Sequence, residues 1–189
     1  MDNYQITTWC RHFVKDHVKE GDICIDATAG NGWDSLLLSR CCGKTGRVTS
    51  FDIQPMAVAR TKERLMEQAP WRNWRVVLDS HRNMDFYEEQ GTVSCIMFNF
   101  GYLPGGDHSV STNPVTSIQA LSLSLELLRP GGLLSLCLYS GGDTGFQERE
   151  SILSWLKTLD FRKYLVIKTD YYNRPGNPPN PVLVVKLTI

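Results

Sequence analysis

The sequence has no long apolar stretch and no excess of charge of either sign. No run of about eighteen apolar residues occurs, and the first positions are polar, which argues against a membrane span and a signal peptide. We therefore expect a cytoplasmic protein. Lysine plus arginine and aspartate plus glutamate number 20 each, so no bulk positive field indicates a large nucleic-acid footprint. A small footprint needs only a local patch, for which Arg60, Lys62 and Arg64, or Arg72 and Arg75, are candidates; the alternative is a solvated helix face.

The sequence also lacks common signatures of metal, disulfide and phosphate sites. Its six cysteines include no C-x-x-C pair, and Cys24, Cys95 and Cys137 fall in predicted strands, where a small thiol packs well. We interpret the cysteines as reduced and predict no metal site; the vicinal pair Cys41-Cys42 leaves a redox or metal site as the alternative. No Walker-type loop, G-x-x-x-x-G-K-[ST], occurs.

What the sequence does contain is a regular alternation of strand and helix patterns over its 189 residues. A content of 42% hydrophobic and 21% charged residues, without repeats or linkers, predicts one globular domain over 1–189. We expect strands at 23–27, 47–52, 74–78, 94–99, 133–139, 163–169 and 181–188, and helices at about 4–18, 34–41, 55–69, 83–88, 115–128 and 145–157.

This alternation predicts an α/β fold with a mostly parallel sheet and helices on both faces. No helix separates the last two strands, so they should form an antiparallel hairpin at one edge. A seven-stranded sheet that ends in a C-terminal antiparallel hairpin is the arrangement of Rossmann-like class I methyltransferases.

The loop D-A-T-A-G-N-G-W-D at 26–34 lies between an apolar strand and a helix, an order typical of a cofactor site. An acid, Asp52, ends the following strand, where it can accept hydrogen bonds from a ribose. A dinucleotide site would need a third glycine, and Ser35 stands there instead. The leading acid Asp26 and the missing cationic clamp favour S-adenosylmethionine; the alternative is a glycine-rich turn without a ligand.

Polar residues follow four consecutive strands, and ligands of open α/β sheets bind at that edge. We assign Asp52 to the ribose hydroxyls with help from Gln54, and Asn31 and Asp34 to the methionine moiety. Near the adenine we expect two residues that follow the third strand, although His81 has a plain capping or solvent-facing role as its alternative. The predicted cofactor-binding residues are Asp26, Gly30, Asn31, Gly32, Asp34, Asp52, Gln54, Ser80 and His81.

The segment Asn99-Phe100-Gly101-Tyr102 indicates the reaction type. An amide oxygen and a backbone carbonyl can accept the two N–H bonds of an amine and so aim its lone pair. Tyr102 can stack on a planar base. The segment resembles the Asn-Pro-Pro-Tyr element of amino-methyltransferases. The alternative is a purely structural role, in which Asn99 ends a strand and Tyr102 packs on the core.

The loop that follows supplies candidate proton acceptors, Asp107 and His108. We therefore predict Asn99, Tyr102 and Asp107 as catalytic residues. A later loop, at 171–179, could clamp the substrate or serve only as a rigid hairpin connection.

Four motifs together resemble the bacterial family named putative rRNA methylase: DATAGNG at 26–32, NFGYLPGGD at 99–107, YSGGDTG at 139–145 and NRPGNPP at 173–179. The resemblance spans nearly the whole chain. It implies a tRNA methyltransferase that uses S-adenosylmethionine to convert wobble 5-aminomethyl-2-thiouridine to its methylaminomethyl form. Trp33 and Gly142 stand where the family often has histidine, which bears on substrate choice more than on cofactor binding.

Our leading interpretation is thus an N-methyltransferase that acts on a tRNA anticodon stem-loop. The neutral charge balance keeps a small-molecule amine methyltransferase as an alternative, and a non-catalytic cofactor- or RNA-binding protein is a second one. The sequence does not decide between a monomer and a homodimer.

Overall fold

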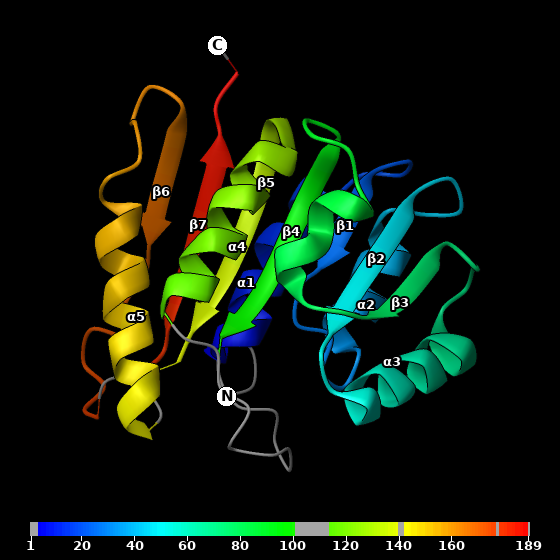
Figure 1. The fold of residues 1–189 in the computed structure, drawn as a ribbon, viewed down its shortest axis with the longest axis horizontal. Coiled ribbons are helices and arrows are strands. Elements are labelled where there is room, and N and C mark those ends of the chain that lie inside the picture. Colours follow the sequence, from blue (N-terminus) through cyan, green and yellow to red (C-terminus); the bar gives the residue numbers. More distant parts are fainter. Residues whose placement is uncertain (1–3, 101–113, 140–141, 177, 189) are drawn as a thin grey trace.

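The computed structural model describes residues 4–100, 114–139, 142–176 and 178–188. One seven-stranded sheet runs through the molecule in the order β3-β2-β1-β4-β5-β7-β6 (Figure 1). The strands are β1 (Ile23–Asp26), β2 (Arg47–Asp52), β3 (Trp74–Leu78), β4 (Val93–Phe100), β5 (Leu128–Leu138), β6 (Tyr164–Lys168) and β7 (Asn180–Lys186).

Strands β1 to β5 pair in parallel, whereas β7 runs antiparallel to both β5 and β6. The expected α/β fold with a C-terminal antiparallel hairpin is confirmed, and it is the fold of the class I methyltransferases. Because β1 to β4 are parallel, their carboxyl ends meet at one edge of the sheet, the lower edge in Figure 1.

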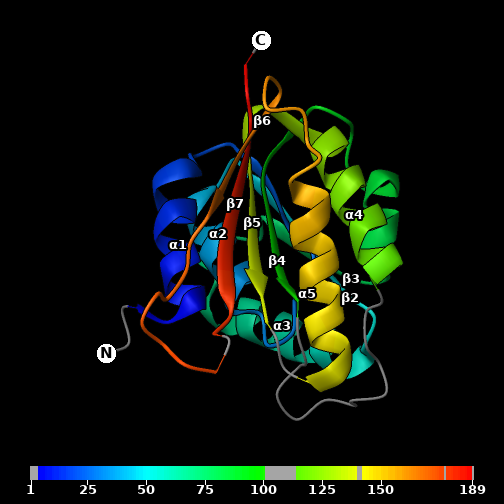
Figure 2. The same ribbon diagram turned by 90° about the vertical axis from the view of Figure 1, so that its left-hand side faces the viewer.

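Helices cover both faces of the sheet, as the sequence predicts. α1 (Ile6–His17), α2 (Trp33–Cys41) and α3 (Pro55–Gln68) lie on one face. The 3-10 helix η2 (His81–Phe86), α4 (Pro114–Leu127) and α5 (Gly142–Leu156) lie on the other (Figure 2). Proline at the first position of α3 and of α4 suits a helix start, because that N–H has no helical partner.

Two apolar layers hold these helices to the sheet. Leu121 of α4 and Ile152 of α5 are fully buried in the cluster that also contains Ile96 and Phe98 of β4. On the opposite face, Leu38 of α2 belongs to a second cluster, with Cys95 of β4. β4 is therefore buried from both sides, as expected for the middle of a parallel sheet.

Several expected element boundaries differ from those observed, and α5, for example, begins at Gly142 rather than at 145. The strand expected to begin at 133 begins at Leu128, because the pairing with β4 shifts register between Val93 and Cys95. Such a bulge admits Pro130 and a left-handed Gly131 (φ 77°) without ending the strand. The short helix expected near 83–88 is the 3-10 helix η2 (His81–Phe86).

Candidate functional site

The glycine-rich loop lies at the carboxyl edge of the sheet and leads into α2. Backbone bonds tie it to both neighbouring strands: Ala27 N donates to Met97 O at 2.9 Å, and Ala29 N donates to Phe51 O at 2.9 Å. Gly32 is the N-cap of α2 with a φ of 78°, and a Cβ there would lie 2.9 Å from Thr61 Cα in α3. Only glycine fits this position, so the close packing of α3 fixes the loop.

Asp52 connects this loop to the start of α3. Its Oδ2 accepts from the backbone N–H of Gly30 at 2.9 Å, and its Oδ1 accepts from the N–H of Gln54 at 2.9 Å. Each carboxylate oxygen has a further lone pair, so the acid can accept two more hydrogen bonds. The structure thus brings together three predicted residues, Asp52, Gln54 and Gly30.

Residues of α3 also support the loop from outside. Thr61 Oγ1 donates to Gly30 O at 3.1 Å, and Arg64 Nε donates to Asn31 O at 2.6 Å. The Arg64 guanidinium lies 3.5 Å from the ring centroid of Trp33, whose side chain is half exposed. The Trp33 ring and the Arg64 guanidinium therefore sit stacked beside the glycine loop.

A second group of side chains links α1, α2 and β4. Asp34 is 5% exposed and forms an ion pair with Arg11, with 2.6 Å between Nε and Oδ1. Asn99 Nδ2 donates to Asp34 Oδ2 at 2.7 Å, and the Asn99 backbone N–H donates to Thr28 Oγ1 at 2.8 Å. The site therefore holds one buried carboxylate between a guanidinium and a carboxamide.

One buried atom of the Asn99 carboxamide has no hydrogen-bond partner among the described residues. Because a carboxylate only accepts, the amide nitrogen must face Asp34, which fixes where the amide oxygen points. That oxygen, Asn99 Oδ1, is buried, and no residue described in the structure donates to it. A buried acceptor without a donor is costly, so it suits a ligand that brings an N–H.

Asp26 lies beneath the loop and is fully buried. Ser35 Oγ donates to its Oδ2 at 2.6 Å, the Thr28 N–H donates to its Oδ1 at 3.2 Å, and Ser50 donates to Ser35 at 2.9 Å. Burial, together with the nearby charge of Asp34, raises the pKa of Asp26 to about 7. Ser35, which replaces the third glycine of a dinucleotide site, thus supports this buried acid.

The predicted adenine-side residues begin η2 beyond β3. Ser80 Oγ accepts from the Arg82 N–H at 3.3 Å, which caps the helix. His81 Nδ1 lies 3.2 Å from Ala27 O, and its ring meets Phe98 edge-on at 5.5 Å between centroids. Burial lowers the pKa of His81, so the neutral ring donates from Nδ1 to the carbonyl that opens the glycine loop.

Asp79, between β3 and Ser80, is held in a fixed orientation. It accepts from Asn83 Nδ2 at 2.8 Å, from the Ser80 N–H at 2.7 Å and from the Tyr87 hydroxyl at 3.0 Å. These bonds, of which that from Asn83 has the largest effect, lower the pKa of Asp79 and keep it ionised. A carboxylate therefore stands at the third strand end as well.

Several predicted residues lie outside the described part of the chain. Tyr102, Asp107 and His108 fall in 101–113, so their catalytic roles stay predictions. The later loop contacts the N-terminal segment, where the Tyr171 hydroxyl donates to Tyr4 O; its role as a clamp also stays a prediction.

Sequence reasoning missed the supporting residues of the site: Arg11, Thr28, Thr61 and Arg64. Arg11 pairs with a residue 23 positions away, and Thr61 reaches Gly30 over 31 positions. No local pattern marks either contact. The glycine at position 32 was the one available signal, since it implies that another element approaches closely.

All six cysteines are free thiols, and Cys24, Cys95 and Cys137 lie buried in β1, β4 and β5 as expected. Within the described ranges, no group of three or more histidine, cysteine or acidic side chains could hold a metal ion. Over the same residues, no helix is long and apolar enough to cross a membrane.

Comparison with solved structures gives close matches over nearly the full length. A crystal structure of a putative rRNA-methylase from Clostridium thermocellum is 43% identical, with a TM-score of 0.92 over 97% of this chain and 98% of that one. A putative methyltransferase from Streptococcus mutans, crystallised in complex with SAH, is 33% identical, with a TM-score of 0.86 and the same coverage.

Comparison with curated proteins adds a tRNA enzyme of a plant. The chloroplastic tRNA (mnm(5)s(2)U34)-methyltransferase of Arabidopsis thaliana is 34% identical over 88% of this chain, which spans 65% of that protein's length. A ubiquinone/menaquinone biosynthesis C-methyltransferase of Legionella pneumophila is 26% identical over 70% of this chain and 49% of its own. The family model described as "Putative rRNA methylase" matches residues 48–185. The chain belongs to this family of methyltransferases.

Proposed function

We propose that the protein is an S-adenosylmethionine-dependent N-methyltransferase that converts the aminomethyl group of a tRNA wobble 5-aminomethyl-2-thiouridine to methylaminomethyl. The proposal is carried by the buried Asn99 Oδ1 beside the glycine loop, which has no hydrogen-bond donor among the residues that the structure describes. The name of the Arabidopsis relative supports the substrate, and the SAH complex of the Streptococcus mutans protein supports the cofactor.

The residues at the carboxyl edge fit this cofactor. Asp52 retains acceptor capacity for two ribose hydroxyls, one on each carboxylate oxygen. The ion pair of Asp34 and Arg11 presents one charge for the ammonium and one for the carboxylate of the methionine moiety. When bound, S-adenosylmethionine supplies an electrophilic methyl group on sulfur.

The adenine side of the site is built from the ends of β3 and β4. We assign Ser80 and His81 to this side, with His81 kept neutral by burial and bonded to Ala27 O. Asp26, which is fully buried, would act by holding Thr28 and Ser35 in place beneath the cofactor. Asn31 and Gly30 contribute through the backbone of the loop.

Asn99 would position the substrate amine for attack. Its Oδ1 accepts one N–H of the amine, while Nδ2 stays bonded to Asp34 and so holds the carboxamide plane fixed. Orientation of this kind is a large part of catalysis in group transfer. Since a primary alkylamine is mostly protonated at neutral pH, a base must remove a proton from the ammonium before the amine can attack. We assign this role to Asp107 or His108. Tyr102 would stack on the uracil ring.

The test is the variant Asn99→Ala in single-turnover assays with a stem-loop RNA that carries the aminomethyl uridine. We expect the rate to fall by roughly tenfold to a thousandfold, because a positioning contact is lost. Cofactor affinity should stay within a few-fold of wild type. As a matched control, Gln90→Ala removes an exposed carboxamide that precedes β4 and is bonded to Glu126. It should change neither the single-turnover rate nor the cofactor affinity. An unchanged rate for Asn99→Ala would refute the amine-holding role.

A further inference from the structure

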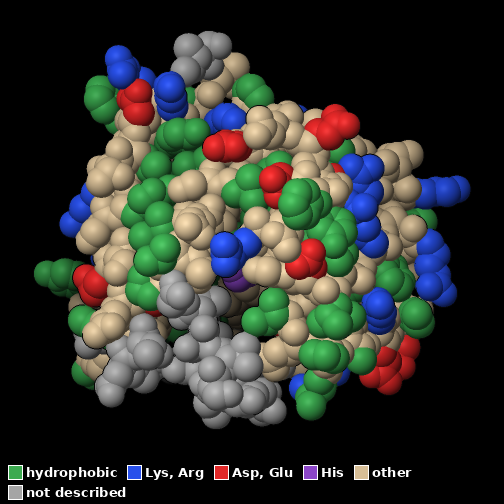
Figure 3. Space-filling model, viewed as in Figure 1, with side chains coloured by type: hydrophobic (Ala, Val, Ile, Leu, Met, Phe, Trp, Pro, Cys, Tyr) green, Lys and Arg blue, Asp and Glu red, His purple; other side chains and the backbone are tan. Residues whose placement is uncertain are grey.

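A groove of about 360 Å³ lies at the opposite edge of the sheet from the cofactor site, where β2 and β3 begin. It is lined by 44–47 and by 72–75. Half of these eight residues are cationic: Lys44, Arg47, Arg72 and Arg75. In Figure 3 the blue side chains gather over this side of the molecule, beside β2 and β3. In a chain with no net charge, this is a local concentration of positive charge.

Glu20 lies against Gly43, next to Lys44, whereas the acid that pairs with the two arginines of the groove is turned inward. Glu88 has a fully buried side chain, which bonds to Arg47 Nη2 at 2.6 Å, Arg75 Nη2 at 2.9 Å and Thr49 Oγ1 at 2.6 Å. The Arg47 and Arg75 side chains remain 50% and 42% exposed. The buried carboxylate therefore holds two guanidinium groups in fixed positions at the surface, while Glu89 adds one exposed negative charge near Arg47.

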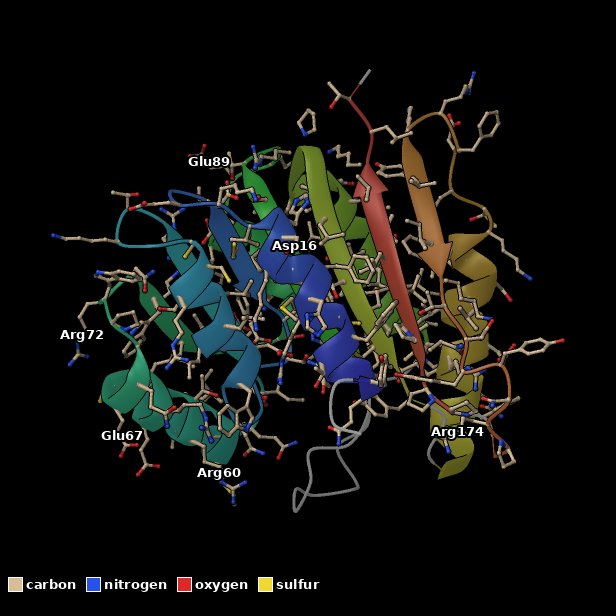
Figure 4. The ribbon with its side chains drawn as sticks, turned by 180° about the vertical axis from the view of Figure 1, so that it is seen from behind. Asp16, Arg60, Glu67, Arg72, Glu89 and Arg174 are labelled. Atoms are coloured by element: carbon tan, nitrogen blue, oxygen red, sulfur yellow. The ribbon has the colours of Figure 1, made fainter. Side chains whose placement is uncertain are left out.

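The walls of the groove are also tied together. Asn73 Nδ2 donates to Ser39 O at 2.9 Å and to Gly43 O at 2.7 Å, and Ser39 Oγ donates to Asn73 Oδ1 at 2.6 Å. Asn73 thus fixes the loop before β3 against the loop before β2. Arg72 projects from this wall toward solvent (Figure 4), with its guanidinium 5.6 Å from the Trp74 ring centroid. A rigid groove of this kind binds an anion at little cost in ordering its side chains.

We propose that this groove binds the phosphate backbone of the RNA stem whose wobble nucleotide enters the catalytic edge. The inference rests on the proposed function for the identity of the polyanion. β2 connects the two sites directly: from Arg47 to Asp52 the strand spans about 16 Å at about 3.3 Å per residue. That distance corresponds to several base-pair steps of an A-form RNA helix, so a stem adjoining the loop can reach both sites.

Guanidinium and ammonium groups bind phosphodiester oxygens without reading sequence. The groove therefore contributes affinity and salt dependence, whereas the carboxyl edge selects the nucleotide. A stem-loop should use both sites, but an oligonucleotide that contains the loop alone should use only the second. This difference separates a backbone groove from a patch that merely increases solubility.

The test is the double variant Lys44→Glu/Arg72→Glu, which leaves the Glu88 ion pairs intact. Its matched control is Lys157→Glu/Lys163→Glu, which makes the same charge change on exposed residues at the other side of the sheet. Binding of a fluorescein-labelled anticodon stem-loop with an unmodified uridine is measured by anisotropy at several salt concentrations. Calorimetry with S-adenosylmethionine and thermal unfolding confirm that each variant is folded and binds cofactor.

We expect the groove variant to raise the stem-loop Kd at least tenfold and to flatten the plot of log K against log salt by about 1–2 units, as loss of two phosphate contacts requires. Its affinity for the loop-only oligonucleotide should match that of the control variant. Equal stem-loop affinity and equal salt slope in the groove and control variants would overturn the proposal, as would a wild-type protein that binds no stem-loop. Groove-dependent binding without methylation of any tRNA would uphold the groove and refute the proposed function.

Discussion

Replacing Asp52 by alanine should abolish cofactor binding at ordinary concentrations. Asp52 is half-buried at the end of β2, and each of its oxygens already accepts a backbone N–H while keeping a lone pair for a ribose hydroxyl. Charge-assisted bonds of this kind contribute on the order of 1.5–3 kcal/mol each. Two of them give about 3–6 kcal/mol, or roughly a 10²- to 10⁴-fold rise in Kd at about 1.4 kcal/mol per tenfold.

Isothermal calorimetry with S-adenosylmethionine measures this directly. A second variant, Asp52→Asn, keeps the shape of the side chain but offers only one accepting oxygen, so its Kd should fall between those of wild type and Asp52→Ala. Asp85→Ala, which removes an exposed carboxylate from η2, is the matched control and should bind as wild type does. If Asp52→Ala binds within a few-fold of wild type, Asp52 is not the ribose anchor and the assignment of the site is wrong.

Two further predictions concern stability. Gly32→Ala should lower the free energy of unfolding, measured by urea denaturation, by more than Gly91→Ala does. Both glycines have a left-handed φ, but of the two only Gly32 would place a Cβ against a backbone atom, Thr61 Cα, at 2.9 Å. Equal losses would show that the packing of α3 does not require glycine at position 32. The pKa of Asp26 is raised from 3.8 to about 7 in the folded protein, so the folded state holds a proton that the unfolded state has lost, and stability should fall as pH rises from about 4 to about 7. Asp26→Asn should show a smaller decline between about pH 4 and pH 7, and an identical decline in both proteins would contradict the buried, protonated acid.

Local pattern predicted the parts of this protein that depend on local chemistry. The glycine loop, the acid at the end of β2 and the alternation of strands and helices are each specified within a few residues, so the fold followed from them, as did the placing of the loop and the acid at the carboxyl edge of the sheet. The extended start of β5 could not be predicted, because Pro130 and Gly131 ordinarily interrupt a strand and a bulge against β4 accommodates them here.

Contacts between side chains that are far apart in the sequence could not be predicted either. Asn99 was expected to hold a substrate amine, but its bond to Asp34 spans 65 positions, and the Arg11–Asp34 pair depends on how α1 packs beside α2. A sequence pattern states which residues end the strands; it does not state which of them share a hydrogen bond. The structure adds that the Asn99 amide nitrogen donates to Asp34, whereas its amide oxygen accepts from no residue in the described ranges.

The most direct test of the central claim is incubation of the protein with isotopically labelled S-adenosylmethionine and total tRNA from cells that lack the wobble modification, followed by nucleoside mass spectrometry. We expect label to appear in 5-methylaminomethyl-2-thiouridine while 5-aminomethyl-2-thiouridine disappears, and we expect Asn99→Ala to slow this conversion. Methylation of free small amines with no labelled nucleoside in any tRNA would contradict it.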